Sequence, residues 1–393
     1  MNPRVNAVVQ VDGERALADA RAERGGVLGG VPFTVKDNLE AAGLAMAMGA
    51  LERVGVVAAR DAAVVSRMRA AGAILLGKTN CPPYGGGIET DNPAHGRTSN
   101  PYDLDRTPGG SSGGEAAAIA AGCSPCGFGT DSGASVRLPA HFCGLAALKP
   151  TAGRVPVAGV LDDLGQIGAL SDPRTQVGML ARSVEDVRTL LAIATGEEVS
   201  GPEVRGLRVA VHGEEGTAAT LKAVHDAAEA LAAAGARVER AAHPGGGHAL
   251  TLEVWRSYGD EMTAAELYAL LRRWDLYRAE MLAWFADRDL VLCPVFPEPA
   301  RRHGDMNRPG EPDPTGYTTP YSLTGWPAAT VRAGASPEGL PIGVQLVAHP
   351  GRDDVALAAA AEVERALGGY RPPPLQPRPG QARSNGRRNG GGS

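Results

Sequence analysis

Three separate stretches of this chain carry residues that could do chemistry together. Lys36 ends a short apolar segment, residues 109–114 read GGSSGG, and residues 129–137 read GTDSGASVR. A serine hydroxyl is a weak nucleophile by itself and needs a base within hydrogen-bond reach. Lysine can serve as that base when burial lowers its pKa, whereas arginine keeps its proton in a protein.

Lysine is rare in a chain that uses arginine almost everywhere. The 39 basic residues include only four lysines, at positions 36, 78, 149 and 222. A retained lysine can mark a position where an amine is needed, and biased codon usage is the alternative explanation. Lys36 is therefore a candidate base because it stands at the end of a predicted strand.

Helix and strand patterns alternate along the first part of the chain. Residues 14–24 and 61–71 predict helices, while residues 31–35 and 73–76 predict short apolar strands. This alternation is typical of an α/β protein in which helices flank a sheet.

Residues 80–113 are almost free of periodicity and are rich in Asn, Pro, Gly, Ser and Thr. A loop of this length inside a compact domain is usually functional or disordered, and its well-patterned neighbours favour a functional loop. The further elements predicted are helices at 115–121, 217–234 and 261–286, and strands at 124–130, 207–211, 290–295, 327–333 and 342–347.

Composition narrows the class of protein. The chain has 393 residues, 43% of them hydrophobic and 21% charged, with a net charge of −5. That length suits one large domain or two ordinary ones. The near-neutral charge argues against a nucleic-acid partner, and no apolar run or basic leader indicates a membrane or an export signal. Five cysteines make no disulfide framework, so we expect a cytoplasmic protein.

Several ordered motifs resemble the amidase signature family of serine hydrolases. They are GGVPFTVKDN at residues 29–38, RTPGGSSGGEAAAIAAG at 106–122, GTDSGASVRLPAHFCGLAALKPTAGRVP at 129–156, and GLPIGVQLVA at 339–348. The resemblance extends over about residues 5–196 and 321–369.

The resemblance implies an α/β/α fold, in which a large, mixed and twisted sheet is flanked by helices. We expect residues 1–371 to form a single catalytic domain. Its signature core is residues 30–196, and its shortened variable region is about residues 200–320. The Pro-, Gly- and Arg-rich residues 372–393 are predicted to be a disordered tail.

Carried over by position, the resemblance implies a Ser-Ser-Lys triad. Ser135 is then the nucleophile, Lys36 the terminal base, and Ser111 the bridging serine, which follows a cis peptide bond from Gly110. The bridging serine would relay the nucleophile's proton to lysine and return it to the leaving amine. The resemblance also implies an oxyanion hole built from the backbone N–H groups of Ser132, Gly133, Ala134 and Ser135.

Some positions depart from the family pattern. Ala134 replaces the second glycine of the usual turn, which costs about 1 kcal/mol if the position needs positive φ. Residues 45–50 read AMAMGA where many members have a threonine-rich stretch. This stretch should make the wall of the site apolar. The N-terminal helical region of the family is largely missing, so we expect an open cleft. The residues expected to contact substrate are Met46, Met48, Pro83, Tyr84, Ser112 and Ile167.

These residues predict a hydrolase that cleaves carbon–nitrogen bonds of small amides without a metal or cofactor. Carbamates (urethanes) and esters fit the same geometry and are the first alternative. The glutaminase-type subunit of a tRNA-dependent amidotransferase is the second, and an inactive binding protein is the third. We also consider a homodimer, in which a second subunit covers surface that the short chain leaves open.

Other patterns offer rival interpretations of the same region. Residues 110–114 fit the G-x-S-x-G nucleophile elbow with Ser112 as nucleophile, but the segment 100–108 before it has two prolines and three charges and is a poor strand. A phosphate-binding loop is weak as well, because no Gly-Lys-Ser/Thr follows the glycines.

Cysteine and histidine also allow redox, zinc or Cys-His chemistry. Cys123 and Cys126 form one C-x-x-C pair without a second pair, which favours core packing. His141 and Cys143 follow the second glycine loop, and we expect structural roles for both.

Overall fold

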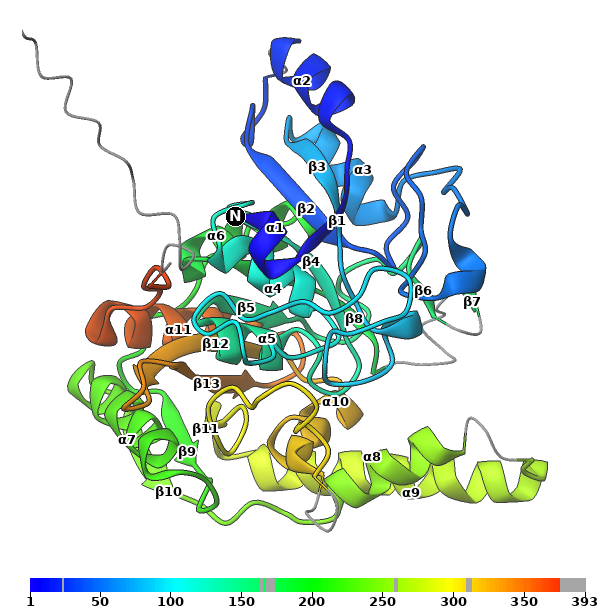
Figure 1. The fold of residues 1–393 in the computed structure, drawn as a ribbon. Helices are drawn as coiled ribbons and strands as arrows, with labels where there is room; N and C mark the ends of the chain where they lie inside the picture. Colours follow the sequence, from blue (N-terminus) through cyan, green and yellow to red (C-terminus); the bar gives the residue numbers. More distant parts are fainter. Residues whose placement is uncertain (23–24, 163–164, 167–173, 258–260, 309–312, 375–393) are drawn as a thin grey trace, which may run out of the picture.

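The computed structural model describes residues 1–22, 25–162, 165–166, 174–257, 261–308 and 313–374. A mixed eleven-stranded sheet runs through it (Figure 1). The order across the sheet is β1 (Val8–Val11), β3 (Ile74–Thr79), β2 (Pro32–Lys36), β4 (Cys126–Asp131), β8 (Gln176–Ala181), β5 (Ala146–Lys149), β12 (Ala328–Ala335), β13 (Pro341–Ala348), β11 (Leu290–Pro294), β9 (Arg208–Val211) and β10 (Arg237–Arg240). β6 (Leu161–Asp162) and β7 (Gly165–Gln166) form a separate short pair.

Helices cover both faces of this sheet. One layer consists of α3 (Ala63–Ala70), α6 (Val184–Thr195), α7 (Ala218–Ala233) and α11 (Asp353–Leu367). The other face carries α4 (Gly113–Ala120) and α5 (Arg137–Cys143). The remaining helices are α1 (Asn2–Val5), α2 (Gly13–Arg21), α8 (Gly247–Arg256), α9 (Ala264–Phe285) and α10 (Thr319–Leu323). The expected α/β fold with a large mixed sheet flanked by helices is confirmed.

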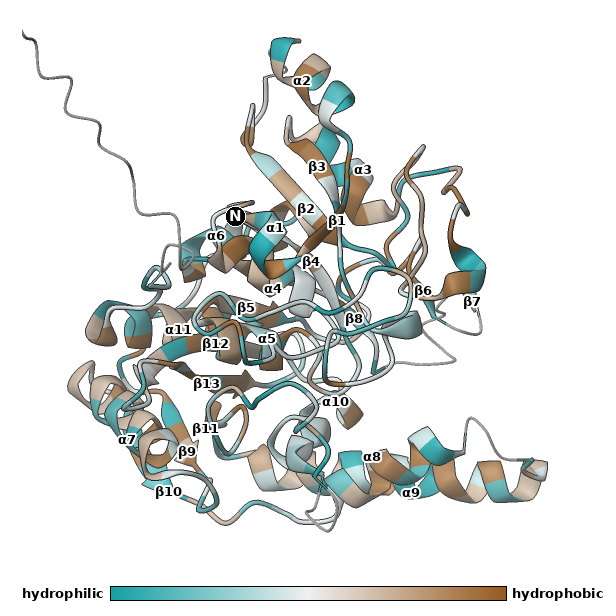
Figure 2. Ribbon diagram, in the orientation of Figure 1, coloured by the Kyte–Doolittle hydropathy of each residue, from teal (hydrophilic) through white to brown (hydrophobic). Residues whose placement is uncertain are grey.

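The two layers follow from the alternation of side chains along each strand. In β5, Ala146 and Leu148 join the core beneath α6 and α11, whereas Ala147 packs with α4 and α5 on the other side. Both faces of the central strands are therefore apolar, as expected for a sheet covered on both sides. Figure 2 shows this for β13, which is hydrophobic along its length.

Helix α4 lies very close to the strands that it covers. All of its residues are buried, and most of them are glycine or alanine. A Cβ atom on Gly114 would lie 2.4 Å from the backbone nitrogen and oxygen of Asn80, so only glycine fits there. This close approach carries Ser111, just before the helix, toward the end of β2.

Helices α8 and α9 extend away from the sheet as an arm (Figure 1). The start of α9 is fixed by a capping box between Thr263 and Glu266. Its buried residues recur every three or four positions and form one apolar stripe toward the body of the protein. They are Leu270, Trp274, Tyr277, Met281 and Phe285.

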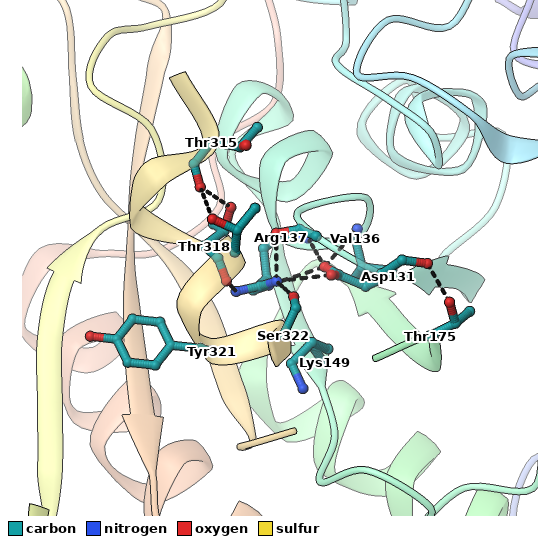
Figure 3. A network of polar contacts seen from close by, with 12 residues as sticks. Asp131, Val136, Arg137, Lys149, Thr175, Thr315, Thr318, Tyr321 and Ser322 are labelled. Carbon is teal, nitrogen blue, oxygen red and sulfur yellow. Dashed lines mark hydrogen bonds and ion pairs between the residues drawn. The ribbon is translucent and has the colours of Figure 1, made fainter. Parts of the chain in front are cut away.

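A buried ion pair joins the end of β4 to the start of α5 (Figure 3). The Arg137 guanidinium donates from Nε and Nη2 to the two carboxylate oxygens of Asp131 at 3.0 and 2.9 Å, and neither side chain is exposed. Burial by itself raises the pKa of Asp131, but Arg137 and its hydrogen bonds outweigh that effect and lower the pKa overall. Arg137 also donates to the Thr318 carbonyl at 2.9 Å and to the Ser322 hydroxyl at 2.6 Å, which ties α10 to the same point.

We predict that Arg137→Met lowers the free energy of unfolding by about 3–5 kcal/mol, because it leaves the buried Asp131 carboxylate without its hydrogen-bonded guanidinium partner. Urea denaturation at neutral pH measures the change. The matched control is Arg208→Met, which removes a solvent-screened pair with Asp289 and should leave the free energy of unfolding almost unchanged.

Equal effects of the two substitutions would contradict this account. The double variant Asp131→Asn with Arg137→Met removes both charges and should recover part of the loss. No recovery would place the cost in the lost hydrogen bonds to α10 instead of in the unpaired charge.

Candidate active site

The predicted base and the predicted bridging serine are in direct contact. Lys36 ends β2, which pairs in parallel with β3 and β4, and its side chain is completely buried. Its Nζ lies 2.6 Å from Ser111 Oγ and 2.6 Å from Thr130 Oγ1. Asn38 Nδ2 donates to the same Thr130 oxygen at 3.2 Å. Thr130 and Asn38 were not among the predicted site residues, although both lie in the motifs that carry the resemblance.

Burial changes the acidity of Lys36. Removal of the ammonium group from water lowers its pKa from 10.5 to about 8, while nearby Cys81 and Asp131 oppose the shift. A large fraction of Lys36 is therefore neutral in mildly alkaline solution. A neutral amine in contact with a hydroxyl can accept a proton from it.

Ser111 lies just before α4, next to the end of β2. The peptide bond between Gly110 and Ser111 is cis, which confirms the expectation for this position. A Cβ atom on Gly110 would lie 2.6 Å from the Glu89 backbone nitrogen, so the loop packs tightly behind the serine. The next residue, Ser112, donates its backbone N–H to the carbonyl of Ser135 at 3.0 Å, which joins the two glycine-containing loops.

The loop 132–135 connects β4 to α5. Asp131 Oδ2 accepts the backbone N–H groups of Val136 and Arg137 at 3.0 and 3.2 Å, so the chain turns sharply into the helix. Ser132 Oγ lies 2.5 Å from Thr175 Oγ1 on the other side of the loop. Within the described part of the chain, no acceptor takes the backbone N–H of Gly133, Ala134 or Ser135. These three donors are available to a bound group.

Ala134 fits its position without backbone strain. Among the described non-glycine residues, positive φ occurs at Asn6, Met48 and Tyr84 and not at Ala134. Its methyl group is buried and packs with Leu138 and Phe142. The replaced glycine therefore carries no conformational penalty in this loop.

Ser111, Thr130 and the loop 132–135 line one cavity of about 410 Å³. Residues 84–88 form another part of its wall, and Asp162, Arg174 and Thr175 a third. Trp255 of α8 completes the lining together with Asn38, Asn307, Asp313 and Thr315. Ser111 and Ser135 thus face one space, although no hydrogen bond joins their hydroxyl groups in this structure.

The residues expected to contact substrate are only partly in this cavity. Tyr84 lines it, whereas Pro83 does not. Met46 and Met48 are buried outside the lining, because their segment packs beneath the turn that contains Tyr84, whose N–H donates to the Met48 carbonyl at 2.8 Å. Ile167 lies outside the described residues.

Ser112 has a different role from the expected one. Its hydroxyl is buried outside the cavity lining and bridges the backbone N–H and carbonyl of Thr130, each at 3.3 Å. Neither a strand before this serine nor a helix cap made by its side chain is present in the described structure. The nucleophile-elbow arrangement therefore does not occur at residues 110–114.

The other rival residues have structural partners. His141 is buried, and its two ring nitrogens are used: Nδ1 accepts the Gly343 N–H at 2.8 Å and Nε2 donates to the Glu298 carbonyl at 3.0 Å. Cys143 and Cys126 are buried free thiols. The described residues contain no group of three or more His, Cys, Asp or Glu side chains placed to hold a metal ion. They also contain no helix that is both long and apolar enough to span a bilayer.

A family model described as Amidase matches residues 1–257 and 255–357. The chain is 32% identical to 6-aminohexanoate-cyclic-dimer hydrolase of Paenarthrobacter ureafaciens, with 93% of this chain and 89% of that protein covered. It is also 32% identical to a subunit of the glutamyl-tRNA(Gln) amidotransferase of Koribacter versatilis, with 92% and 91% covered.

A solved structure of 6-aminohexanoate cyclic dimer hydrolase complexed with substrate matches this fold with a TM-score of 0.81. The identity is 30%, and the match covers 95% of this chain and 92% of that one. Family model, relatives and fold thus point to the same group of enzymes. The chain belongs to the amidase family, whose members carry the amidase signature.

Proposed function

We propose that this protein hydrolyses the carbon–nitrogen bond of small amides through an acyl-enzyme on Ser135. The observation that carries the proposal is the buried contact of 2.6 Å between Lys36 Nζ and Ser111 Oγ, at the wall of the cavity that Ser135 also lines. Membership of the amidase family and similarity to a 6-aminohexanoate-cyclic-dimer hydrolase support the same chemistry.

The proposed reaction uses the triad as a proton relay. Ser135 Oγ attacks the amide carbonyl while its proton passes to Ser111, and Ser111 gives its own proton to neutral Lys36. The relay then returns a proton to the leaving nitrogen, because an amine anion is not a viable leaving group. Water, activated by the same relay, then attacks the acyl-enzyme and releases the carboxylic acid and free Ser135. The three unengaged N–H groups of the loop 132–135 would stabilise the oxyanion, with each good donor worth roughly 3 kcal/mol.

Carbamates and esters present their carbonyl carbon to the same groups, so we propose them as additional substrates. The glutaminase subunit of a tRNA-dependent amidotransferase is a second candidate function, because the relative from such an enzyme is 32% identical over most of the chain. A panel of amides, carbamates, esters and glutamine, assayed with the isolated protein, separates these functions. Release of ammonia from glutamine alone would favour the second candidate.

Ser135→Ala should lower turnover by about 10⁴-fold or more, because it removes the attacking oxygen. Thermal unfolding should be nearly unchanged, since Ser135 is only half-buried. Labelling with a fluorophosphonate probe and peptide mass mapping locate the reactive serine. We expect an adduct on Ser135 in the native protein and weaker labelling in Lys36→Ala and Ser111→Ala.

Ser132→Ala is the matched control, because it removes a neighbouring hydroxyl of the same loop. It should leave the position of the adduct unchanged. An adduct on another serine, or substantial turnover by pure Ser135→Ala protein, would overturn the assignment of the nucleophile.

The rate should rise with pH as Lys36 loses its proton. Protonated lysine cannot accept the serine proton, so kcat/KM should increase about tenfold per pH unit below pH 8 and level off above it. A profile from pH 6 to 9.5 measures the inflection. A flat profile would exclude Lys36 as the base.

Lys149 provides a control for this profile. It is also completely buried, and burial followed by the nearby Arg137 lowers its pKa to about 7, but it does not line the cavity. Lys149→Met should therefore keep the inflection near pH 8. Loss of the inflection in that variant would assign it to Lys149.

A further inference from the structure

An indole ring lies directly against the loop that holds the proposed nucleophile. Trp255, near the end of α8, is half-buried and lines the cavity. A Cβ atom on Gly133 would lie 2.5 Å from Trp255 Cη2 and 2.7 Å from Cζ2. Position 133 therefore requires glycine because the benzo edge of the indole occupies the space beside it.

This indole is held in place from behind. The Arg174 guanidinium carbon lies 5.8 Å from the centroid of the Trp255 ring and 5.6 Å from that of Trp274. Both distances fall within the roughly 6 Å over which a cation and an aromatic face attract each other. Arg174 is 1% exposed, and Trp274 Nε1 donates to the Leu323 carbonyl at 2.6 Å. Trp255 is thus the outer member of a buried stack anchored in the core.

One stretch of the cavity wall carries no side chains. Residues 85–87 are three consecutive glycines that line the same cavity. A Cβ atom on Gly85 would lie 3.4 Å from Lys36 Nζ and 3.8 Å from Ser111 Oγ, so this bare backbone borders the proton relay. Tyr84 and Trp255 are the aromatic side chains among the described residues of this lining, and the indole of Trp255 is the one that packs against the loop 132–135.

We propose that Trp255 is a specificity-determining residue that selects substrates with a planar group, such as an aryl ring, next to the scissile bond. The proposal rests on the proposed amide hydrolysis and names its substrate class. A flat ring gains contact over its whole face against a fixed indole, whereas a puckered saturated ring of similar size touches it at a few atoms. Offset aromatic pairs gain stability beyond the area that they bury. We expect a preference of about threefold to tenfold for the planar partner.

Two pairs of substrates of similar size test this selection. Benzamide and cyclohexanecarboxamide differ in planarity on the acyl side, and acetanilide and N-cyclohexylacetamide differ on the amine side. Because the members of each pair also differ in intrinsic reactivity, the readout is the change in the planar-to-puckered ratio of kcat/KM between native protein and Trp255→Leu. Leucine keeps apolar bulk and removes the flat face. The ratio should fall about threefold to tenfold in at least one pair, through KM.

Trp284→Leu is the matched control. Trp284 also packs against an arginine, Arg288, at 5.1 Å, but it does not line the cavity. Its loss should leave both ratios unchanged. An unchanged ratio in Trp255→Leu, or an equal change in both variants, would overturn the proposal. If Trp255→Leu does not fold, Trp255→Phe keeps a smaller flat face and should show an intermediate ratio, and a ratio equal to that of native protein would overturn it.

Binding without turnover separates this inference from the proposed function. Calorimetry with Ser135→Ala protein compares benzamide and cyclohexanecarboxamide directly, and the added change Trp255→Leu should weaken benzamide binding about threefold to tenfold and leave the other ligand unaffected. If no substrate is hydrolysed but this difference is found, the proposed reaction fails and the selection by Trp255 stands. If hydrolysis occurs and the difference is absent in binding and in rate, the proposed reaction stands and the selection by Trp255 fails.

Discussion

The buried pair of Asp131 and Arg137 is the interaction on which the rest of this site depends. The Asp131 carboxylate accepts two backbone N–H groups and so turns the chain from β4 into α5. The Arg137 side chain completes the charge balance and also holds the Gly133 carbonyl at 2.9 Å. With that carbonyl and those amides committed, the N–H groups of residues 133–135 remain for the cavity. A single charge pair thus sets the direction of the strand, the helix and the loop between them.

The surroundings of Lys36 show how a buried lysine can approach neutrality. Its neighbour Lys78 lies on the adjacent strand and pairs with Asp37, with 3.6 Å between Nζ and Oδ1. Asp131 is committed to Arg137. Each nearby carboxylate therefore already has a cation of its own, so Lys36 gains only part of the stabilisation that a dedicated partner would supply. Desolvation then dominates, and the pKa falls to about 8.

The contact between Lys36 and Ser111 was more predictable from the sequence than the lining of the cavity. Lys36, Ser111 and Ser135 lie in dense motifs whose spacing survives in the fold, and the apolar strands at β2, β3 and β11 appear close to their predicted bounds. Other elements, among them helix α11 and strand β8, were not predicted. Trp255 and Arg174 lie in separate segments that meet only in the folded protein, so no local pattern could place them in one cavity lining with Ser135.

The arm formed by α8 and α9 separates one wall of the cavity from the part of the fold that holds Lys36, Ser111 and Ser135. The groups of the proposed proton relay come from the ends of sheet strands and the loops that follow them, while the indole wall is contributed by a helix outside the sheet. Mutations that lengthen, tilt or replace the arm would reshape the wall without moving the relay. Substitutions in α8 and α9 can therefore change which substrates fit the cavity, while the buried Lys36 and its contact with Ser111 stay unchanged.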